Sequence, residues 1–418
     1  MSRSDVVIIG AGAVGLASAH YLRAQGRSVT VLERGEDVGA GSSLHNAGLA
    51  VPSHIVPLAS PGLIAQGMKW MLNPESPFYI KPRLDADLFR WFLLFRKQAT
   101  AAHVQRTAPL LRDLLLASVA LYRKFAAMDD MRFEFQEQGL LMLYDTEKGR
   151  VAETALAARA TALGLEARVL SNDEVNALDP ALQSKAQGGV YFPQDTHLTP
   201  ALFVHALAAR LRRDGVSIVT GVRDLSYVVR NGRVAAVRTA DGEYEATDVV
   251  MASGAWAPAL MRPLGVKLLI QAGKGYSVTI PNPPRQLRMP LILNETKVAV
   301  TPMGNTLRLA GTLEFAGLDL TVNERRVRAI MRALPRYLAD YDLSTVDISG
   351  AWAGLRPCTP DGLPYLGRSR AMPNVIVAAG HAMIGMSLAP ITGQLVAELV
   401  AGATTSLDVR ALAVERFG

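Results

Sequence analysis

The sequence predicts an α/β fold with a second domain of the α+β class. Residues 6–9 and 29–32 are short apolar runs on either side of a helical stretch, as in a strand, helix and strand of a parallel sheet. The region 217–310 is mainly β, with turns of the Asn-Gly and Asp-Gly type between its first strands. A buried strand at 375–378 leads through glycines into a last helix that ends near residue 400. We therefore expect one parallel-sheet domain assembled from separated segments, with a mixed or antiparallel sheet and helices in the excursions between them.

A glycine-rich turn joins the first strand to the first helix. Gly10, Gly12 and Gly15 have the spacing GxGxxG, in which the first allows a tight turn, the second a close approach of amides to a pyrophosphate, and the third close packing of helix on strand. The helix N-terminus adds free N–H groups and a positive dipole end. Glu33, at the end of the second strand, is placed to accept hydrogen bonds from an adenosine ribose. The pattern predicts a bound dinucleotide, with Ala13, Val14 and Arg34 beside it.

Composition limits the function classes. The 418 residues, 50% hydrophobic and 19% charged, indicate an ordered globular chain of two or three domains. The net charge of +7 comes from scattered basic residues without a dense block, so nucleic acid is not an expected partner, whereas an anionic substrate or membrane surface is. A single cysteine, Cys358, excludes an internal disulfide and fits a reducing compartment. We find no secretory signal and no 18-residue apolar run, and expect a cytoplasmic protein, either free or peripheral on the inner face of the membrane.

The remaining elements follow in order. Residues 49–84 are rich in proline and glycine and predict an irregular lid over a pocket. Residues 87–98 predict a helix with aromatic and leucine faces and basic ends, either a core helix of the second domain or a membrane-surface helix. Strands are expected to turn at 138–139 within 133–144. Further helices are predicted at 109–128, 148–163, 200–213 and 323–338, with a short one from residue 172.

Longer stretches carry a resemblance to a known family. GHAMIGMSLAP (380–390) is similar to the closing motif of glycine-oxidase-like enzymes. KGYSVTI (274–280), LNETKVAVTP (293–302), WAGLRPCTPDGLPYLGR (352–368) and PLASPGLIAQGMKWM (57–71) look like the bacterial D-amino-acid dehydrogenase branch. With the opening motif, nearly the whole chain resembles the D-amino-acid oxidase superfamily of flavoproteins.

The resemblance implies a Rossmann-like FAD-binding domain from residues 1–52, 196–262 and 347–418, and a substrate domain from 53–195 and 263–346. It implies non-covalent FAD, because Cys358 does not fall where family members with covalent flavin carry their cysteine. His45 departs from the small or polar residue usual before Asn-Ala-Gly. The implied flavin contacts are Ser42, Ser43, His45, Asn46, Ala47 and Gly48 beside the ring, Val222 at the adenine, Ser253, Gly254 and Trp256 in a second small-residue turn, and Gly380, His381, Met383, Ile384, Gly385, Met386 and Ser387 at the pyrimidine edge.

Three residues are the predicted catalytic set. The resemblance makes Arg356 the group that grips the substrate carboxylate, which a planar guanidinium can do with two hydrogen bonds, although a structural salt bridge is the alternative. Tyr276 is expected either to donate a second hydrogen bond to that carboxylate or to be a core tyrosine on a strand. His54, in the predicted lid, either contacts substrate or is an ordinary loop residue. The sequence shows no metal-ligand spacing and no Ser/His/Asp triad, and we expect no metal.

The resemblance implies oxidative deamination of D-amino acids, in which hydride leaves the α-carbon for flavin N5 and the imino acid hydrolyses to a 2-oxo acid and ammonia. D-Proline and hydroxyproline isomers are candidate substrates, and a quinone or an electron-transfer protein is the expected acceptor. Two alternatives stay open at this point. One is a glycine or secondary-amine oxidase that uses dioxygen, and the other is a non-catalytic flavin-binding subunit of a larger dehydrogenase.

Overall fold

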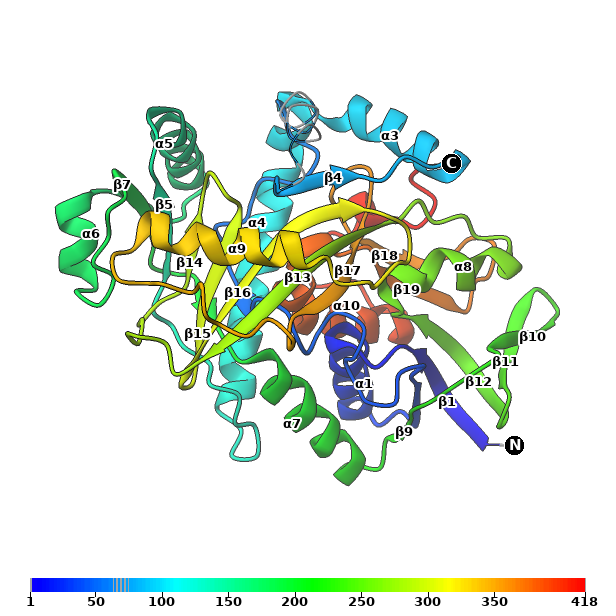
Figure 1. Ribbon diagram of the computed structural model, residues 1–418. Coiled ribbons are helices and arrows are strands. Elements are labelled where there is room, and N and C mark those ends of the chain that lie inside the picture. The colour runs from blue at the N-terminus through cyan, green and yellow to red at the C-terminus, as the bar shows by residue number, and fades with distance from the viewer. Residues whose placement is uncertain are drawn as a thin grey trace.

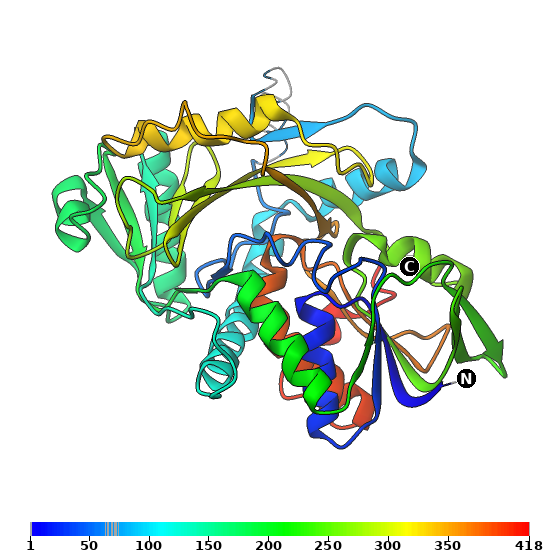
Figure 2. The ribbon, with the colours of Figure 1, turned by 60° about the horizontal axis from the view of Figure 1, so that its bottom comes forward.

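The computed structural model describes residues 2–62, 64, 67, 70, 73 and 75–417. They form two large sheets, one of eight strands and one of nine (Figure 1). In Figure 2 the nine-stranded sheet arches across the upper half, with helix α9 (Glu324–Tyr337) on its outer face, and the helices of the eight-stranded sheet lie below. Parts of the predicted lid at 49–84 and of the 57–71 motif fall outside the described residues.

The eight-stranded sheet has the parallel core that the sequence predicts. Strand β1 (Ser2–Ile9) pairs in parallel with β2 (Val29–Leu32) on one side and β12 (Gly242–Met251) on the other. The apolar runs are buried because helices cover the sheet, so alternation is absent from them. The other strands of this sheet are β9 (Ser217–Val219), β10 (Ser226–Arg230), β11 (Arg233–Thr239), β18 (Tyr365–Arg368) and β19 (Val375–Ala379).

Helices pack this sheet into the largest hydrophobic core of the described chain. Helix α1 (Ala13–Ala24) lies against α7 (Pro200–Arg213) and α10 (Gly385–Ala401), and α4 (Ala101–Ala126) lies against α10. Helix α4 begins earlier than the predicted start at 109, because Thr100 caps it by accepting a hydrogen bond from the amide of His103. The prediction rested on the apolar spacing that begins at Leu110, whereas in the structure Pro109 lies inside the helix.

The nine-stranded sheet has the order β17, β13, β16, β15, β14, β5, β7, β6, with β4 beside β16. The hairpin predicted at 138–139 is wrong, because β5 (Leu140–Tyr144) pairs with β7 and β14 and only a single bridge forms at Gln136. The other strands are β4 (Phe78–Ile80), β6 (Arg168–Ser171), β7 (Gly188–Phe192), β13 (Gln271–Pro281), β14 (Leu291–Leu293), β15 (Val298–Met303), β16 (Thr306–Phe315) and β17 (Trp352–Cys358). A two-stranded sheet joins β3 (Leu49–Ala50) to β8 (Thr196–His197), and the helices on this side are α3 (Ala86–Gln98), α5 (Glu147–Ala162), α6 (Asn172–Leu178) and α9.

Strand β17 carries the C-terminal part of the chain into the nine-stranded sheet. It pairs antiparallel with β13 from Cys358 opposite Gln271 to Trp352 opposite Ser277. The chain then returns to the eight-stranded sheet at β18. The proposed division places residues 347–418 in the FAD-binding domain. Within that segment, β17 is the part that joins the nine-stranded sheet instead.

A bulge in β16 changes which side chains face the two sides of that sheet. Thr312 has φ +66°, a conformation that a β-branched residue rarely adopts, and the register with β13 shifts at this point. Leu307 and Leu309 pack toward α9. Without a bulge, side chains would go on alternating along the strand, and residues 311, 313 and 315 would also face α9. Instead Glu314 lies on the α9 side, and Leu313 and Phe315 pack on the other side near Trp91.

We expected no segment that could span a membrane, but one helix is long and apolar enough to do so. By length and composition alone, residues Ala382–Ala401 would suffice to cross one. Their charges are few, but 67% of the tested window is buried inside the molecule, where α10 packs between α1 and α4. This is the burial expected of a central core helix.

Candidate active site

A cavity of about 1000 Å³ opens between the two sheets. Twenty-four of the twenty-seven predicted site residues line it, and only Gly15, Gly48 and Gly380 do not. The lining residues among those predicted are Gly10, Gly12, Ala13, Val14, Glu33, Arg34, Ser42, Ser43, His45, Asn46, Ala47, His54, Val222, Ser253, Gly254, Trp256, Tyr276, Arg356, His381, Met383, Ile384, Gly385, Met386 and Ser387.

The glycine turn at one end of this cavity has the geometry that the motif predicts. Gly10 has φ +110°, and a Cβ there would lie 2.6 Å from the carbonyl oxygen of Ala252. A Cβ on Gly15 would lie 1.9 Å from the carbonyl oxygen of Gly10, so this glycine lets α1 pack on the turn although it does not face the cavity. A Cβ on Gly12 would meet only the hydroxyl of Ser43, at 3.3 Å, and Gly12 itself lines the cavity.

The end of β2 presents an acid and a cation to the same cavity. The Glu33 carboxylate accepts hydrogen bonds from the amides of Ala11 (2.7 Å) and Gly35 (2.8 Å), which hold it at the cavity wall and leave further lone pairs for hydroxyl donors. The Arg34 guanidinium lies 4.3 Å from the ring centroid of Trp256. An anchored acid, a stacked arginine and a glycine turn at the N-terminus of α1 fit the ribose, base and phosphates of a dinucleotide.

The segment 42–48 is fastened to the nine-stranded sheet by an arginine that the sequence did not predict. Arg308, on β16, donates from Nη1 to the carbonyls of Leu44 (3.1 Å) and Asn46 (3.0 Å) and from Nε to the Thr279 hydroxyl (3.1 Å). Its side chain is buried, which lowers its pKa to about 10, and no acid within the described chain compensates its charge. Arg308 therefore sets the path of a segment that lines the cavity.

The start of α10 forms another wall. The Ser387 hydroxyl donates to the carbonyl of Leu49 (2.7 Å), and the Tyr122 hydroxyl donates to the carbonyl of Met386 (2.6 Å). His381 is buried beside Thr392, and burial lowers its pKa to about 4, so its ring is neutral near pH 7. A helix N-terminus without acidic neighbours in its first turn suits a negatively charged ligand edge.

Arg356 lies where the cavity meets the nine-stranded sheet. Its Nη1 donates to the carbonyl of Thr312 (2.8 Å), and its guanidinium lies so close over Gly275 that a Cβ there would be 1.7 Å from Nη1. Burial lowers the pKa of Arg356. No acid in the described part of the chain pairs with Arg356, so the salt-bridge alternative is not what this geometry shows, and an anionic ligand can approach the remaining N–H groups.

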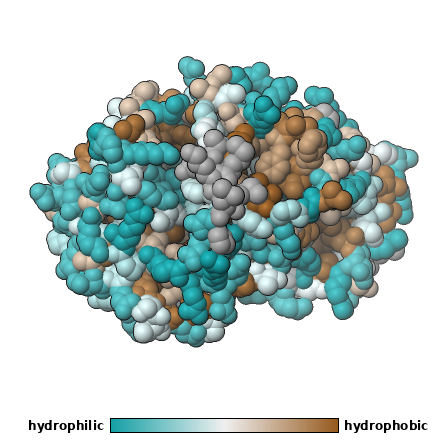
Figure 3. Space-filling view, turned by 45° about the horizontal axis from the view of Figure 1, so that its top comes forward, coloured by the Kyte–Doolittle hydropathy of each residue, from teal (hydrophilic) through white to brown (hydrophobic). Residues whose placement is uncertain are grey.

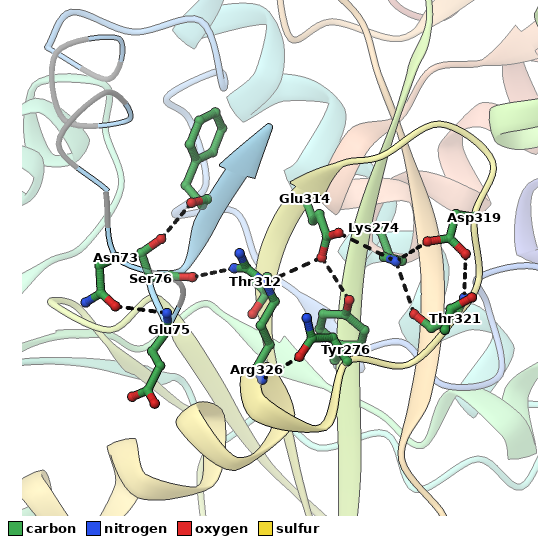
Figure 4. Close-up of polar contacts among 12 residues, drawn as sticks. Asn73, Glu75, Ser76, Lys274, Tyr276, Thr312, Glu314, Asp319, Thr321 and Arg326 are labelled. Atoms are coloured by element: carbon green, nitrogen blue, oxygen red, sulfur yellow. Dashed lines mark hydrogen bonds and ion pairs between the residues drawn. The ribbon is translucent and has the colours of Figure 1, made fainter. Parts of the chain in front are cut away.

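The structure turns Tyr276 away from Arg356. Its hydroxyl donates to the Glu314 carboxylate (2.8 Å) within a cluster that includes Lys274 and Arg326, on the α9 side of the sheet (Figure 4). Side chains alternate along β13, so Gly275 lies on the Arg356 face and Tyr276 on the opposite face. Of the two sequence interpretations, the geometry places Tyr276 with the core residues. Burial and the Glu314 carboxylate raise its pKa.

His54 lies at the cavity with a polar pair behind it. The Ser53 hydroxyl donates to the Asp195 carboxylate, and the His54 Nδ1 lies 3.3 Å from that hydroxyl. When Asp195 is ionised, the Ser53 hydroxyl donates its proton to that carboxylate, so His54 Nδ1–H is the donor to Ser53 and Nε2 stays an acceptor. Burial lowers the pKa of His54 to about 4, so the ring is neutral and can accept a hydrogen bond from a substrate.

The buried Asp195 predicts a pH dependence of stability. Burial raises its pKa to about 7 against the hydrogen bonds from Ser53, whereas an unfolded aspartate titrates near 3.8. The folded state therefore holds a proton that the unfolded state lacks between about pH 4 and 7, and the unfolding free energy falls as pH rises through this window, by on the order of 4 kcal/mol. In Asp195→Asn, urea unfolding at pH 5, 6, 7 and 8 should lose this slope. An equal slope in wild type and variant would contradict the assignment.

Sequence reasoning missed several residues of this site. Arg308, Thr312, Glu153, Asn294 and Lys297 either line the cavity or hold its walls. Asn294 and Lys297 stand in the motif LNETKVAVTP, which indicates the family but does not by itself indicate that these two side chains line a cavity. Among the described residues, no group of three or more His, Cys, Asp or Glu side chains could hold a metal ion.

The comparisons with known proteins agree with this arrangement. D-amino acid dehydrogenases from Paramagnetospirillum magneticum and Granulibacter bethesdensis are 34% and 31% identical to this chain, over 99% of it and 98% and 99% of their own lengths. Glycine oxidase from Geobacillus kaustophilus superposes with a TM-score of 0.78 at 24% identity, covering 100% of this chain and 99% of that one. L-proline dehydrogenase from P. horikoshii superposes with a TM-score of 0.75 at 20% identity, covering 100% and 98%.

These structures confirm the predicted two-domain fold, with its Rossmann-like FAD-binding domain built from discontinuous segments. The family model described as DAO, FAD dependent oxidoreductase, matches residues 5–399. The cofactor of the family is FAD, and the glycine turn, Glu33 and the start of α10 lie at one cavity. The chain belongs to the DAO family of FAD-dependent oxidoreductases.

Proposed function

We propose that this chain is an FAD-dependent D-amino acid dehydrogenase that deaminates its substrate oxidatively. The observation that carries the proposal is the partly buried Arg356, a cation without an acidic partner in the described chain, at the cavity that the predicted dinucleotide-binding turn also lines. The full-length relatives at 31–34% identity carry that name. An intact substrate-side arginine argues against a non-catalytic flavin-binding subunit.

The chain's own residues bind and orient the substrate. Arg356 grips the α-carboxylate through the N–H groups that Thr312 leaves free, which directs the α-hydrogen toward the flavin. Neutral His54 accepts a hydrogen bond at the cavity, and the apolar lid residues Trp70 and Phe78 help to exclude water. The bound flavin supplies the hydride acceptor. Because this grip requires only an α-carboxylate, cyclic substrates such as D-proline or a hydroxyproline isomer remain candidates.

The direct test mixes the purified holoenzyme anaerobically with a panel of D- and L-amino acids, including D-proline and hydroxyproline isomers, and follows flavin bleaching. Bleaching by D-amino acids and not by their L-enantiomers supports the proposal. A flavin that no amino acid bleaches would exclude it and favour the non-catalytic alternative.

The proposed acceptor is a quinone or an electron-transfer protein. We therefore expect stopped-flow reoxidation of the reduced enzyme in air-saturated buffer to be slow relative to turnover with a dye or a soluble quinone. Peroxide released at the turnover rate would instead favour the dioxygen-using oxidase of glycine or secondary amines.

The FAD is proposed to be non-covalent. Cys358 is fully buried beside Trp91 and Leu313, it does not line the cavity, and burial raises the pKa of its thiol to about 12. A protonated, enclosed thiol is a poor nucleophile. Acid or heat denaturation should therefore release all the FAD into the supernatant. Yellow colour that stays with the precipitate would show a covalent bond.

A peripheral contact with the cytoplasmic face of the membrane completes the proposal. Figure 3 shows apolar surface beside the grey residues, and the exposed apolar side chains in and next to α3 are Leu84, Phe89 and Leu93. Arg90, Arg96 and Lys97 on the same helix supply the positive charge that anionic lipids attract. Flotation with anionic vesicles tests the contact, with neutral vesicles as control. Equal recovery with both kinds of vesicle, or none with either, would contradict it.

A further inference from the structure

The cavity extends past Arg356 along the nine-stranded sheet to a second polar end. This arm passes the apolar side chains of Ile292 on β14 and Met142 on β5. It ends at Glu153 on α5 and at Asn294 and Lys297 in the turn between β14 and β15. None of these three polar residues belongs to the dinucleotide site or to the Arg356 end.

Glu153 is an acidic residue on the buried face of helix α5. The buried face of α5 consists of Gly149, Glu153, Ala157 and Ala160, so the glutamate is the one ionisable side chain among small residues. It is 7% exposed, and its Oε2 has no hydrogen-bond partner within the described residues. Burial raises its pKa, the charge of Lys297 acts in the opposite direction, and the charge of Glu295 adds to the rise. A buried acid without hydrogen bonds is costly unless a ligand supplies them.

Asn294 and Lys297, the two polar residues beside Glu153, offer hydrogen-bond donors. The Lys297 ammonium donates to Asn294 Oδ1 at 2.6 Å, which leaves it further N–H groups and leaves the Asn294 amide nitrogen as a donor. The end of the arm therefore combines an acceptor with donors, and the opposite charges of Glu153 and Lys297 lie within the field of the Glu295 carboxylate behind them.

We infer that this arm binds the far end of the substrate side chain and selects an uncharged end that both donates and accepts hydrogen bonds, a carboxamide or ureido group. This inference rests on the proposed function. Glu153 accepts from the N–H₂ of that group, and Lys297 or Asn294 donates to its carbonyl oxygen. A cationic end would meet the Lys297 charge, an anionic end would meet Glu153, and an apolar end would leave Glu153 without a partner.

The dimensions require an extended side chain. Four strand steps lead from β13, which carries Gly275 under the Arg356 guanidinium, to β5, and they amount to about 19 Å at the usual strand spacing. The concave curvature of the sheet in Figure 2 and the side chains that project from both ends shorten the gap. We therefore expect D-glutamine and D-citrulline to reach both ends, and D-alanine and D-serine to reach only Arg356.

The test compares kcat/KM for D-glutamine with that for D-methionine, which has a similar length and an apolar end. Wild type should prefer D-glutamine, and Glu153→Leu should lower the ratio by about 10- to 100-fold, mainly through D-glutamine. Glu153→Gln keeps the shape and should give a smaller fall with normal FAD content. Glu147→Leu is the matched control, since Glu147 lies on the same helix but pairs with Arg150 at the surface, and it should leave the ratio unchanged.

The outcomes separate the two proposals. Oxidation of D-methionine with no preference for D-glutamine in wild type, or with the same ratio in Glu153→Leu, would overturn the inference and leave the proposed function standing. A change confined to the KM for a quinone would also overturn it, because the arm would then serve the acceptor. If no amino acid reduces the wild-type flavin, the proposed function itself fails.

Discussion

Arg356→Lys should lower kcat/KM for the best amino acid by about 2–4 kcal/mol of transition-state stabilisation. Lysine keeps the positive charge but loses the planar fork, so it cannot both donate to Thr312 and hold a carboxylate with two parallel hydrogen bonds. Arg356→Ala should be worse. The FAD content of both variants should stay normal, because the guanidinium lies over Gly275 and donates to Thr312, both in the nine-stranded sheet, whereas the glycine turn belongs to the other sheet. Steady-state kinetics with matched flavin absorbance measures the effect.

The control for this experiment is the substrate. An amine that lacks the carboxylate should react poorly with wild type and lose little more in either variant, since it has no group for Arg356 to hold. Gly275→Ala provides an independent check, because its Cβ would lie 1.7 Å from Nη1 and must displace the guanidinium. If both Arg356 variants reduced flavin as fast as wild type, the carboxylate would have to bind elsewhere in the cavity.

Arg308→Met should weaken FAD binding and lower the unfolding free energy by about 2–5 kcal/mol. The methionine fills similar space but leaves the carbonyls of Leu44 and Asn46 without donors in a buried place. The segment that these carbonyls belong to lines the cavity, so its displacement should raise the Kd for FAD. Fluorescence titration of the apoprotein with FAD and urea unfolding of the same sample measure the two effects.

Arg328→Met is the matched control, since Arg328 is an exposed arginine on α9 whose ion pair with Glu324 is long, at 3.6 Å. It should change neither quantity by more than about 0.5 kcal/mol. A wild-type Kd for FAD in Arg308→Met would show that the 42–48 segment keeps its path without this arginine.

The sequence was sufficient to predict those elements that depend on residues close together in the chain. The strand, turn, helix and strand of 6–32 formed as predicted, because the glycine spacing and the apolar runs are local features. The acidic end of β2 and the helix N-terminus at 385 also lie at the cavity, since each follows directly from the element that carries it. Helix α7 has the predicted ends, because proline starts it and its last turn is followed by a glycine.

Only the tertiary structure decided which face of a strand each side chain occupies and which distant residues it contacts. Tyr276 and Arg356 are both on strands at the cavity, but one residue of alternation and the bulge at Thr312 place the tyrosine hydroxyl with Glu314 on the other face. A bulge has no clear sequence signal here, because Thr312 is a residue type that seldom adopts a positive φ. Pairings such as Arg308 with Leu44 join residues 264 positions apart, so no local pattern records them.

The sequence by itself therefore predicted a turn for a dinucleotide and an acid for its ribose, and its resemblance to a family implied an arginine for a carboxylate. The tertiary structure decided which side chains share the cavity with them. It brought Glu153 and Lys297, from a helix and a turn far apart in the chain, to the end opposite Arg356. The physical reason is that local spacing specifies helices, strands and turns, whereas the packing of two sheets specifies which of their faces meet.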